Sequence, residues 1–89
     1  MTLRIQKAAR AKVVVYALSG RIRAEEVADL LRLFEVEGQD RRIVLDLKEV
    51  KLVDRDAVKF LARCEANGTR LENSPAYIRE WIGREGPRR

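Results

Sequence analysis

Three aspartates, Asp46, Asp54 and Asp56, come closest to a chemical site by residue type and spacing. Paired carboxylates can act as general acid and base or hold a divalent cation. Asp54 and Asp56, however, fall in the first turn of an expected helix, where capping and the helix dipole favour aspartate in any case. We therefore expect helix-start residues rather than a metal site or a catalytic pair. Asp46 interrupts an apolar strand, and we expect it to accept hydrogen bonds from the adjacent loop backbone.

The residue types that are missing exclude much enzyme chemistry. The 89 residues include no histidine, which removes Ser-His-Asp and Cys-His catalysis and histidine-containing zinc sites. Cys64 is the only cysteine, so an internal disulfide and a CxxC site are excluded. Its place on an apolar stripe predicts a buried, inert thiol. With no glycine-rich phosphate loop either, the sequence predicts no enzymatic activity, no cofactor and no metal.

The cysteine content and the lack of long apolar runs predict where in the cell the protein is found. A single cysteine is typical of a reducing cytosol. We see no apolar run of membrane-spanning length and no signal-peptide pattern. We therefore expect a cytoplasmic protein with no membrane partner.

Hydrophobic periodicity predicts the elements that must position these residues. The polar stretch 7–12 is expected to be a turn, and Ser19-Gly20 is expected to end the second strand. The segment 48–53 is expected to be a connection whose apolar residues fold onto the core. Asp54 is the expected N-cap of one helix, and Ser74 that of another, with Pro75 at its first position. The expected strands are 2–6, 13–18, 43–47 and 69–72, and the expected helices are 24–37, 55–66 and a last one containing Tyr77, Ile78, Trp81 and Ile82.

Strands that alternate with helices after an initial strand pair imply parallel strands joined by helical crossovers. The expected fold class is α/β, with a mixed, mostly parallel sheet of four to five strands flanked by helices. The continuous apolar run 13–18 predicts a strand buried on both faces. The length suits one domain, which we place at 1–82, followed by a basic flexible tail at 83–89.

Two expected helices carry apolar stripes that should face the sheet. The C-terminal ends of these helices are marked by Gly38 and by Asn67-Gly68. Tyr77 and Trp81 are expected to pack the last helix, with part of Trp81 left exposed to a partner. The stripes comprise Val27, Leu30, Leu31 and Phe34 on the first helix and Ala57, Phe60, Leu61 and Cys64 on the second.

Taken together, three segments resemble the STAS domain, the module of anti-sigma factor antagonists and of the cytoplasmic tails of sulfate transporters. They are the apolar strand ending in Gly20 with Arg21-Ile22-Arg23 and a helix; the segment Ile43-Val44-Leu45-Asp46-Leu47-Lys48-Glu49-Val50 with Leu52-Val53-Asp54; and the helix from Asp54 with Asn67-Gly68 and a short strand. The resemblance covers nearly the whole chain, from about Val13 to Ile82, and rests on the order and spacing of these segments.

The resemblance implies a non-catalytic bacterial regulatory module of signalling and transcription, which binds an anti-sigma factor or another kinase-like protein. Many members are switched by phosphorylation of a serine in an Asp-Ser-Ser-Gly pattern at the start of this helix. The matching residues here are Asp54-Arg55-Asp56-Ala57. Asp56 replaces the phosphorylated serine, so phosphorylation there is impossible. Its carboxylate either mimics the phosphorylated state in part or belongs to a member that works without the switch.

The partner-binding surface is expected at the N-terminal end of this helix and in the adjoining loops. Its residues are Asp54, Arg55, Asp56, Ala57, Lys59, Ser19 and Arg21.

The net charge of +5 leaves other functions open. We interpret it as steering toward an acidic partner or as an aid to solubility. A small basic nucleic-acid-binding protein is the main alternative, although the sequence has no recognition-helix signature and no aromatic residues among its basic ones. A homo-oligomer paired through an edge strand is a further alternative.

Overall fold

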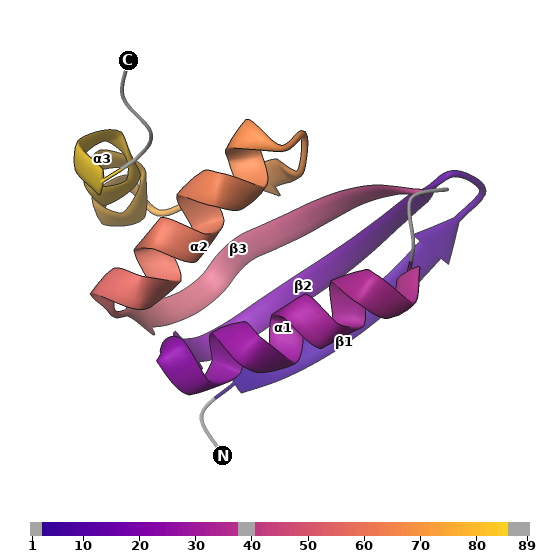
Figure 1. Ribbon diagram of the computed structural model, residues 1–89, viewed down its shortest axis with the longest axis horizontal. Coiled ribbons are helices and arrows are strands. Elements are labelled where there is room, and N and C mark those ends of the chain that lie inside the picture. Colours follow the sequence, from indigo (N-terminus) through magenta and orange to yellow (C-terminus); the bar gives the residue numbers. More distant parts are fainter. Residues whose placement is uncertain (1–2, 38–40, 86–89) are drawn as a thin grey trace.

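Strands and helices alternate along most of the chain in the computed structural model, which describes residues 3–37 and 41–85 (Figure 1). The fold is α/β, as predicted. The elements in chain order are β1 (Leu3–Arg10), β2 (Val13–Ile22), α1 (Ala24–Glu37), β3 (Arg42–Val53), α2 (Arg55–Ala66), β4 (Arg70–Glu72) and α3 (Ala76–Glu85).

Within the described residues the strands form one four-stranded sheet in the order β1-β2-β3-β4. β1 and β2 are antiparallel, whereas β2 with β3 and β3 with β4 are parallel. The two parallel pairs are connected by α1 and α2, as a helical crossover requires. The prediction of a mixed, mostly parallel sheet flanked by helices is confirmed.

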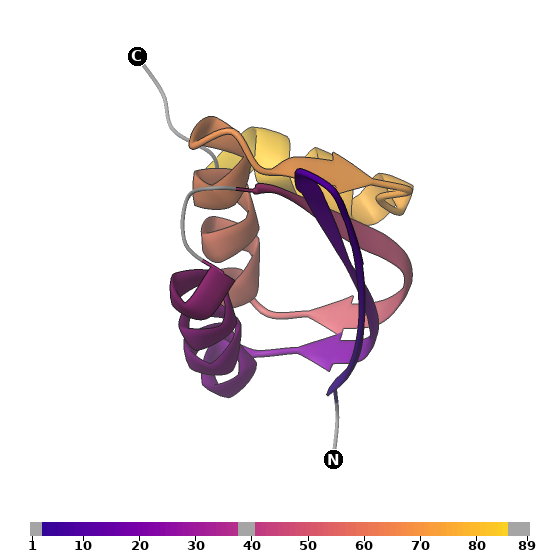
Figure 2. The same ribbon diagram turned by 90° about the vertical axis from the view of Figure 1, so that its right-hand side faces the viewer.

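Helices α1 and α2 lie on the same face of the sheet, and α3 lies next to α2 at the β4 side (Figures 1 and 2). None of the described helices covers the opposite face over β1 and β2 (Figure 2). Burial therefore alternates along β2: Val14, Tyr16 and Leu18 are buried, whereas Val13 is 36% exposed. The prediction that 13–18 is buried on both faces is wrong, because its unbroken apolar character reflects β propensity rather than two-sided cover.

Most of the polar stretch predicted as a turn instead forms the second half of an edge strand. β1 continues to Arg10 and pairs residue by residue with β2, so that Lys7 lies opposite Tyr16 and Arg10 opposite Val13. The turn itself comprises only Ala11 and Lys12, with Ala11 at φ 45°. Backbone pairing on one side is sufficient for an edge strand, so polar side chains do not prevent it.

The second and third strands are also longer than predicted. β2 passes through Ser19 and Gly20 to Ile22, and the register against β3 shifts on either side of this pair. The extra residues at both shifts lie in β3, and Gly20 in the facing strand has φ 102°, a conformation that glycine adopts without strain. The stretch predicted as a connection is the second half of β3, and two of its apolar residues, Val50 and Val53, are buried as expected.

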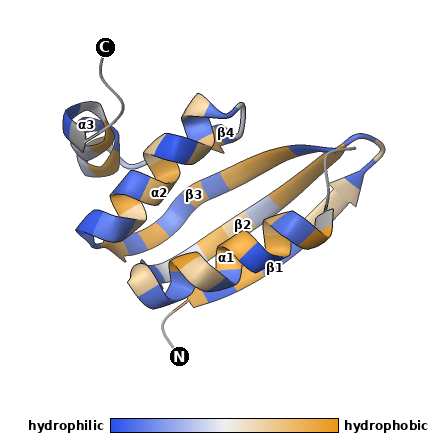
Figure 3. Cartoon of the chain, in the orientation of Figure 1, coloured by the Kyte–Doolittle hydropathy of each residue, from blue (hydrophilic) through white to orange (hydrophobic). Residues whose placement is uncertain are grey.

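The hydrophobic core lies between the sheet and the first two helices. Figure 3 shows the hydrophobic residues of β2 and β3 running beneath α1 and α2. The predicted stripe of α2 is confirmed, because Ala57, Phe60, Leu61 and Cys64 are all buried. On α1 the prediction is wrong for Leu31, which is 47% exposed. Leu33 packs against the core in its place.

The last helix begins and ends slightly later than predicted. Its first backbone bonds run from Ile78 and Arg79 to the carbonyl oxygen of Pro75, so Pro75 precedes the helix rather than opening it. Ser74 does not act as the predicted cap, because its buried hydroxyl makes no hydrogen bond. The helix continues through Gly83 to Glu85, into the segment predicted as tail. The remainder of that tail, and Gly38, lie outside the described residues.

Candidate functional site

Two helices begin side by side at one edge of the sheet. β2 leads into α1 and β3 into α2, and the last residues of these strands, Ile22 and Val53, are partners in the parallel register. The backbone N–H of Asp54 also donates to the carbonyl oxygen of Ile22 at 3.2 Å. Both helix N-termini, each with unsatisfied N–H groups and a partial positive charge, are therefore close together.

The carboxylate of Asp54 joins the two helix starts. Its Oδ1 accepts from the N–H of Ala57 at 2.9 Å, which confirms Asp54 as the N-cap of α2. Its Oδ2 accepts from the N–H of Ala24, the first residue of α1, at 3.1 Å. Sequence reasoning missed Ala24, because a cap formed by a residue of another element leaves no periodic or local signal.

The start of α1 has a second cap of its own. The backbone N–H of Arg23 donates to Oε1 of Glu26 at 2.9 Å, and the carbonyl oxygen of Arg23 accepts from Val27. This is the return half of a capping box, in which the side chain three residues into the helix bonds the backbone before it. Together with Asp54, Glu26 holds α1 at a fixed place beside α2.

Charged side chains surround the corner, by which we mean the adjacent starts of α1 and α2 that Asp54 joins. Arg55, Asp56 and Lys59 of α2 are exposed, so they are accessible to a partner. Ala57 differs, because its methyl group is completely buried. Its part in the site is therefore to donate its N–H to Asp54 rather than to touch a partner.

The other two predicted site residues lie in a strand rather than in a loop. Ser19 is half-buried in β2 and pairs in register with Glu49. Arg21 is exposed and pairs with Leu52 of β3, close to where both strands end. Leu52 belongs to the adjoining segment 48–53, whose apolar residues were predicted to fold onto the core, and for Leu52 that prediction is wrong, because it is 43% exposed.

Asp46 has the structural role expected of it. Its Oδ1 accepts from the backbone N–H of Lys48 at 3.0 Å and from the side-chain amide of Asn73 at 3.1 Å. These bonds fix the carboxylate between β3 and the turn after β4. Asp46 is thus held away from Asp54, and the aspartates do not form one cluster.

Neither a thiol site nor a metal site is formed by the described residues. Burial raises the pKa of the Cys64 thiol to about 12, with a smaller opposing effect of Arg63, so Cys64 stays protonated at neutral pH. Ranges 3–37 and 41–85 contain no group of three or more metal-ligating side chains. No helix within those ranges is long and apolar enough to cross a membrane.

Comparison with known proteins identifies the architecture. Neither the protein-family models nor the curated proteins include a match to this chain. Among solved structures, the chain is similar to an anti-sigma factor antagonist STAS domain from Rhodobacter sphaeroides. The TM-score is 0.55 at 16% sequence identity, over 96% of this chain and 79% of that one. The chain has the STAS fold.

The corner where β3 passes into α2 carries two of the residues that the sequence resemblance singled out, Asp54 and Asp56. Asp54 caps α2 through Ala57, and Asp56, two residues further on, occupies an exposed position in the first turn.

Proposed function

We propose that this chain is a non-catalytic protein–protein interaction module, a regulatory adaptor that resembles an anti-sigma factor antagonist. Its partner is an anti-sigma factor or another kinase-like regulatory protein in the bacterial cytoplasm. The observation that carries this proposal is the double cap by Asp54, which fixes the start of α2 against α1. A rigid surface loses little conformational entropy on binding, so such a corner suits recognition.

The docking surface comprises the exposed side chains around that corner. Asp56, Arg55 and Lys59 supply alternating charges on α2, and Arg21 and Leu52 supply a cation and an apolar contact at the ends of β2 and β3. Charges placed in this way determine which partner is accepted and how quickly it associates.

Asp56 stands where many of the resembling domains have a phosphorylated serine, and its carboxylate is permanent. A carboxylate carries one negative charge, less than the roughly −1.5 to −2 of a phosphoserine. We infer that phosphorylation at position 56 does not switch partner binding in this module, which therefore stays in one binding state. The test is Asp56→Ser, treated with the kinase partner. Phosphorylation of the new serine together with altered partner binding supports the inference, and no effect on either contradicts it.

The experiment that tests the docking surface is a tagged pull-down from native cell extract, read by mass spectrometry. Wild type is compared with Asp56→Lys and with the matched control Glu35→Lys, which makes the same charge change at an exposed position near the other end of α1. We expect a kinase-like or sigma-regulatory protein with wild type and with Glu35→Lys, and its loss with Asp56→Lys. Equal recovery in all three samples would contradict this surface.

A second candidate function, nucleic-acid binding, is favoured by the sheet face that no helix covers. Arg10 and Arg42 flank Val13 there through the strand registers, and Lys12 is adjacent in the turn. Single-stranded nucleic acids usually also need aromatic stacking platforms. Tyr16 is the one aromatic residue in the described strands, and it is 1% exposed on the core side. Gel retardation that weakens steeply with salt would favour this candidate over the adaptor.

A further inference from the structure

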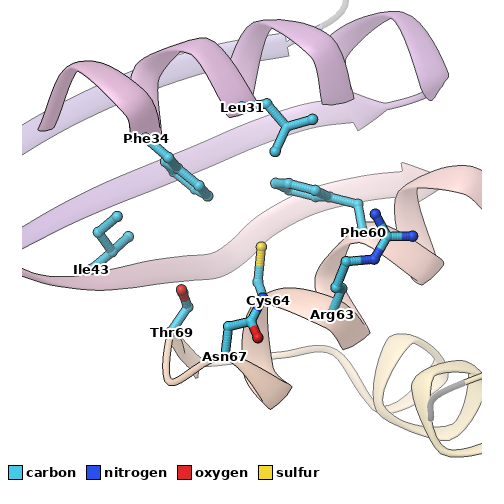
Figure 4. A pocket seen from close by; sticks show the side chains of 8 residues that line it. All are labelled: Leu31, Phe34, Ile43, Phe60, Arg63, Cys64, Asn67 and Thr69. Carbon is cyan, nitrogen blue, oxygen red and sulfur yellow. The ribbon is translucent and has the colours of Figure 1, made fainter. Parts of the chain in front are cut away.

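We propose that a cavity between α1 and α2 binds a small carboxylate whose apolar body is a single ring or a short alkyl chain. The cavity has a volume of about 250 Å³, and most of its helical lining residues, shown in Figure 4, come from the C-terminal halves of the two helices. Its apolar walls are formed by Leu31 and Phe34 of α1, Ile43 of β3 and Phe60 of α2.

The cavity follows from the way the two helices are joined. Asp54 holds their N-termini together through Ala24 and Ala57. From that corner the helices diverge along their length (Figure 1). Side chains must fill the widening space, and at the wide end they leave part of it empty. The site is therefore at the opposite end of α2 from the proposed docking surface and does not depend on it.

An aromatic cluster forms one wall of the cavity. The rings of Phe34 and Phe60 stack with centroids 5.9 Å apart, and Tyr16 lies 5.7 Å from Phe34. Leu31 points into the same space in Figure 4, yet it is 47% exposed. An engineered apolar cavity of about 150 Å³ holds benzene in another protein. A cavity of 250 Å³ therefore has room for a ring or a short chain with its head group.

The rest of the lining is polar and determines the charge of the ligand. The polar lining residues are Arg63, Asn67 and Thr69, and the guanidinium of Arg63 extends beside Phe60 (Figure 4). The helix carbonyl oxygens at this end already accept bonds, since the N–H groups of Asn67 and Thr69 both donate to that of Cys64. The cation therefore dominates the polar side, and a guanidinium binds a carboxylate through paired hydrogen bonds.

Cys64 adds no negative charge to the cavity. Its sulfur faces the interior between the aromatic rings and Thr69 (Figure 4). Because burial raises the pKa of this thiol to about 12, the side chain is uncharged at neutral pH. It contributes an apolar contact and does not repel an anion.

The test is a titration of the full chain followed by amide chemical shifts in NMR. The probes are phenylacetate and octanoate, and phenylacetamide is the neutral analogue. We expect both carboxylates to shift the amides of Phe34, Ile43, Asn67 and Thr69, and the neutral amide to bind about tenfold more weakly, the effect of losing one charged hydrogen bond.

Two variants test whether Arg63 is the cation that binds the carboxylate. Arg63→Gln keeps the length of the side chain and should weaken phenylacetate about tenfold while leaving phenylacetamide unchanged. The matched control is Arg32→Gln, an exposed cation on α1 that does not line the cavity, and it should leave both affinities unchanged. The proposal is overturned if neither carboxylate shifts these amides, if the shifts spread over the basic surface instead, or if Arg63→Gln binds phenylacetate as wild type does.

Discussion

Oδ2 of Asp54 accepts a hydrogen bond from the N–H of Ala24 at 3.1 Å, across 30 residues of sequence. The other oxygen of the same carboxylate caps α2 through Ala57 at 2.9 Å. One side chain therefore satisfies a backbone donor at the start of each of two neighbouring helices. Because both strands that lead into these helices are paired, the corner is fixed by sheet and cap together.

Removal of this carboxylate should cost more than an ordinary cap. We expect Asp54→Ala to lower the free energy of unfolding by about 2–3 kcal/mol, because two caps worth about 0.5–2 kcal/mol each are lost. Asp54→Asn should cost about half as much, because one side-chain oxygen remains to cap one helix. Urea denaturation measures both. The control, Asp56→Asn, should cost less than about 1 kcal/mol, and an equal loss in all three variants would contradict the double cap.

The packing of α3 should stabilise the fold through one face of the helix only. Ile78 is completely buried, whereas Tyr77 beside it is 44% exposed. We expect Ile78→Ala to lower the free energy of unfolding by about 2–5 kcal/mol, and Tyr77→Ala to lower it by less than about 1 kcal/mol. Thermal or urea unfolding distinguishes the two. Similar losses would mean that α3 packs through a different face.

Stability should fall at alkaline pH because of Cys64. Its pKa is about 12 in the folded protein and 9.0 for an unperturbed thiol. The unfolded chain therefore loses this proton first, and stability present below pH 9 declines as the pH rises from 9 toward 12. The slope from this group is at most about 1.4 kcal/mol per pH unit. Urea unfolding across this range should show a shallower decline for Cys64→Ala, and parallel curves would contradict the assignment.

A two-pronged ion pair links α2 to α3. Arg79 donates to the two carboxylate oxygens of Glu65 at 2.9 and 2.7 Å. The two side chains are 44% and 39% exposed, so solvent screens the pair. A double-mutant cycle with Arg79→Ala and Glu65→Ala should give a coupling energy of less than about 1 kcal/mol. A coupling several times larger would show that this contact, rather than Ile78 and Ile82, determines where α3 docks.

Periodicity and capping predicted the parts of the fold that depend on local sequence. The bounds of α2 follow from Asp54 at one end and Asn67-Gly68 at the other, and both ends are confirmed. The errors in strand bounds concern β1, the end of β2 and the second half of β3, where polar residues are held by pairing with a neighbouring strand. Such pairing depends on tertiary structure, which no local pattern records.

The capping role of Asp54 was predictable from the sequence, but the contacts around it were only partly so. Asp54 and Asp56 were located from the resemblance and from the helix start. The burial of Ala57 followed from its place on the apolar stripe, but the bond from Ala24 could not be inferred, because it depends on how α1 and α2 lie relative to each other. The cavity beside Cys64 has the same origin, since it arises from the divergence of two helices.

The most direct test of the central claim is amide hydrogen exchange of the full chain. It is measured with the chain alone and with the chain bound to the partner recovered in the pull-down. We predict slower exchange in 54–59 and at the ends of β2 and β3, with no change at Arg10 and Lys12 on the uncovered sheet face. Protection of that sheet face, with 54–59 unchanged, would contradict the docking surface at the start of α2.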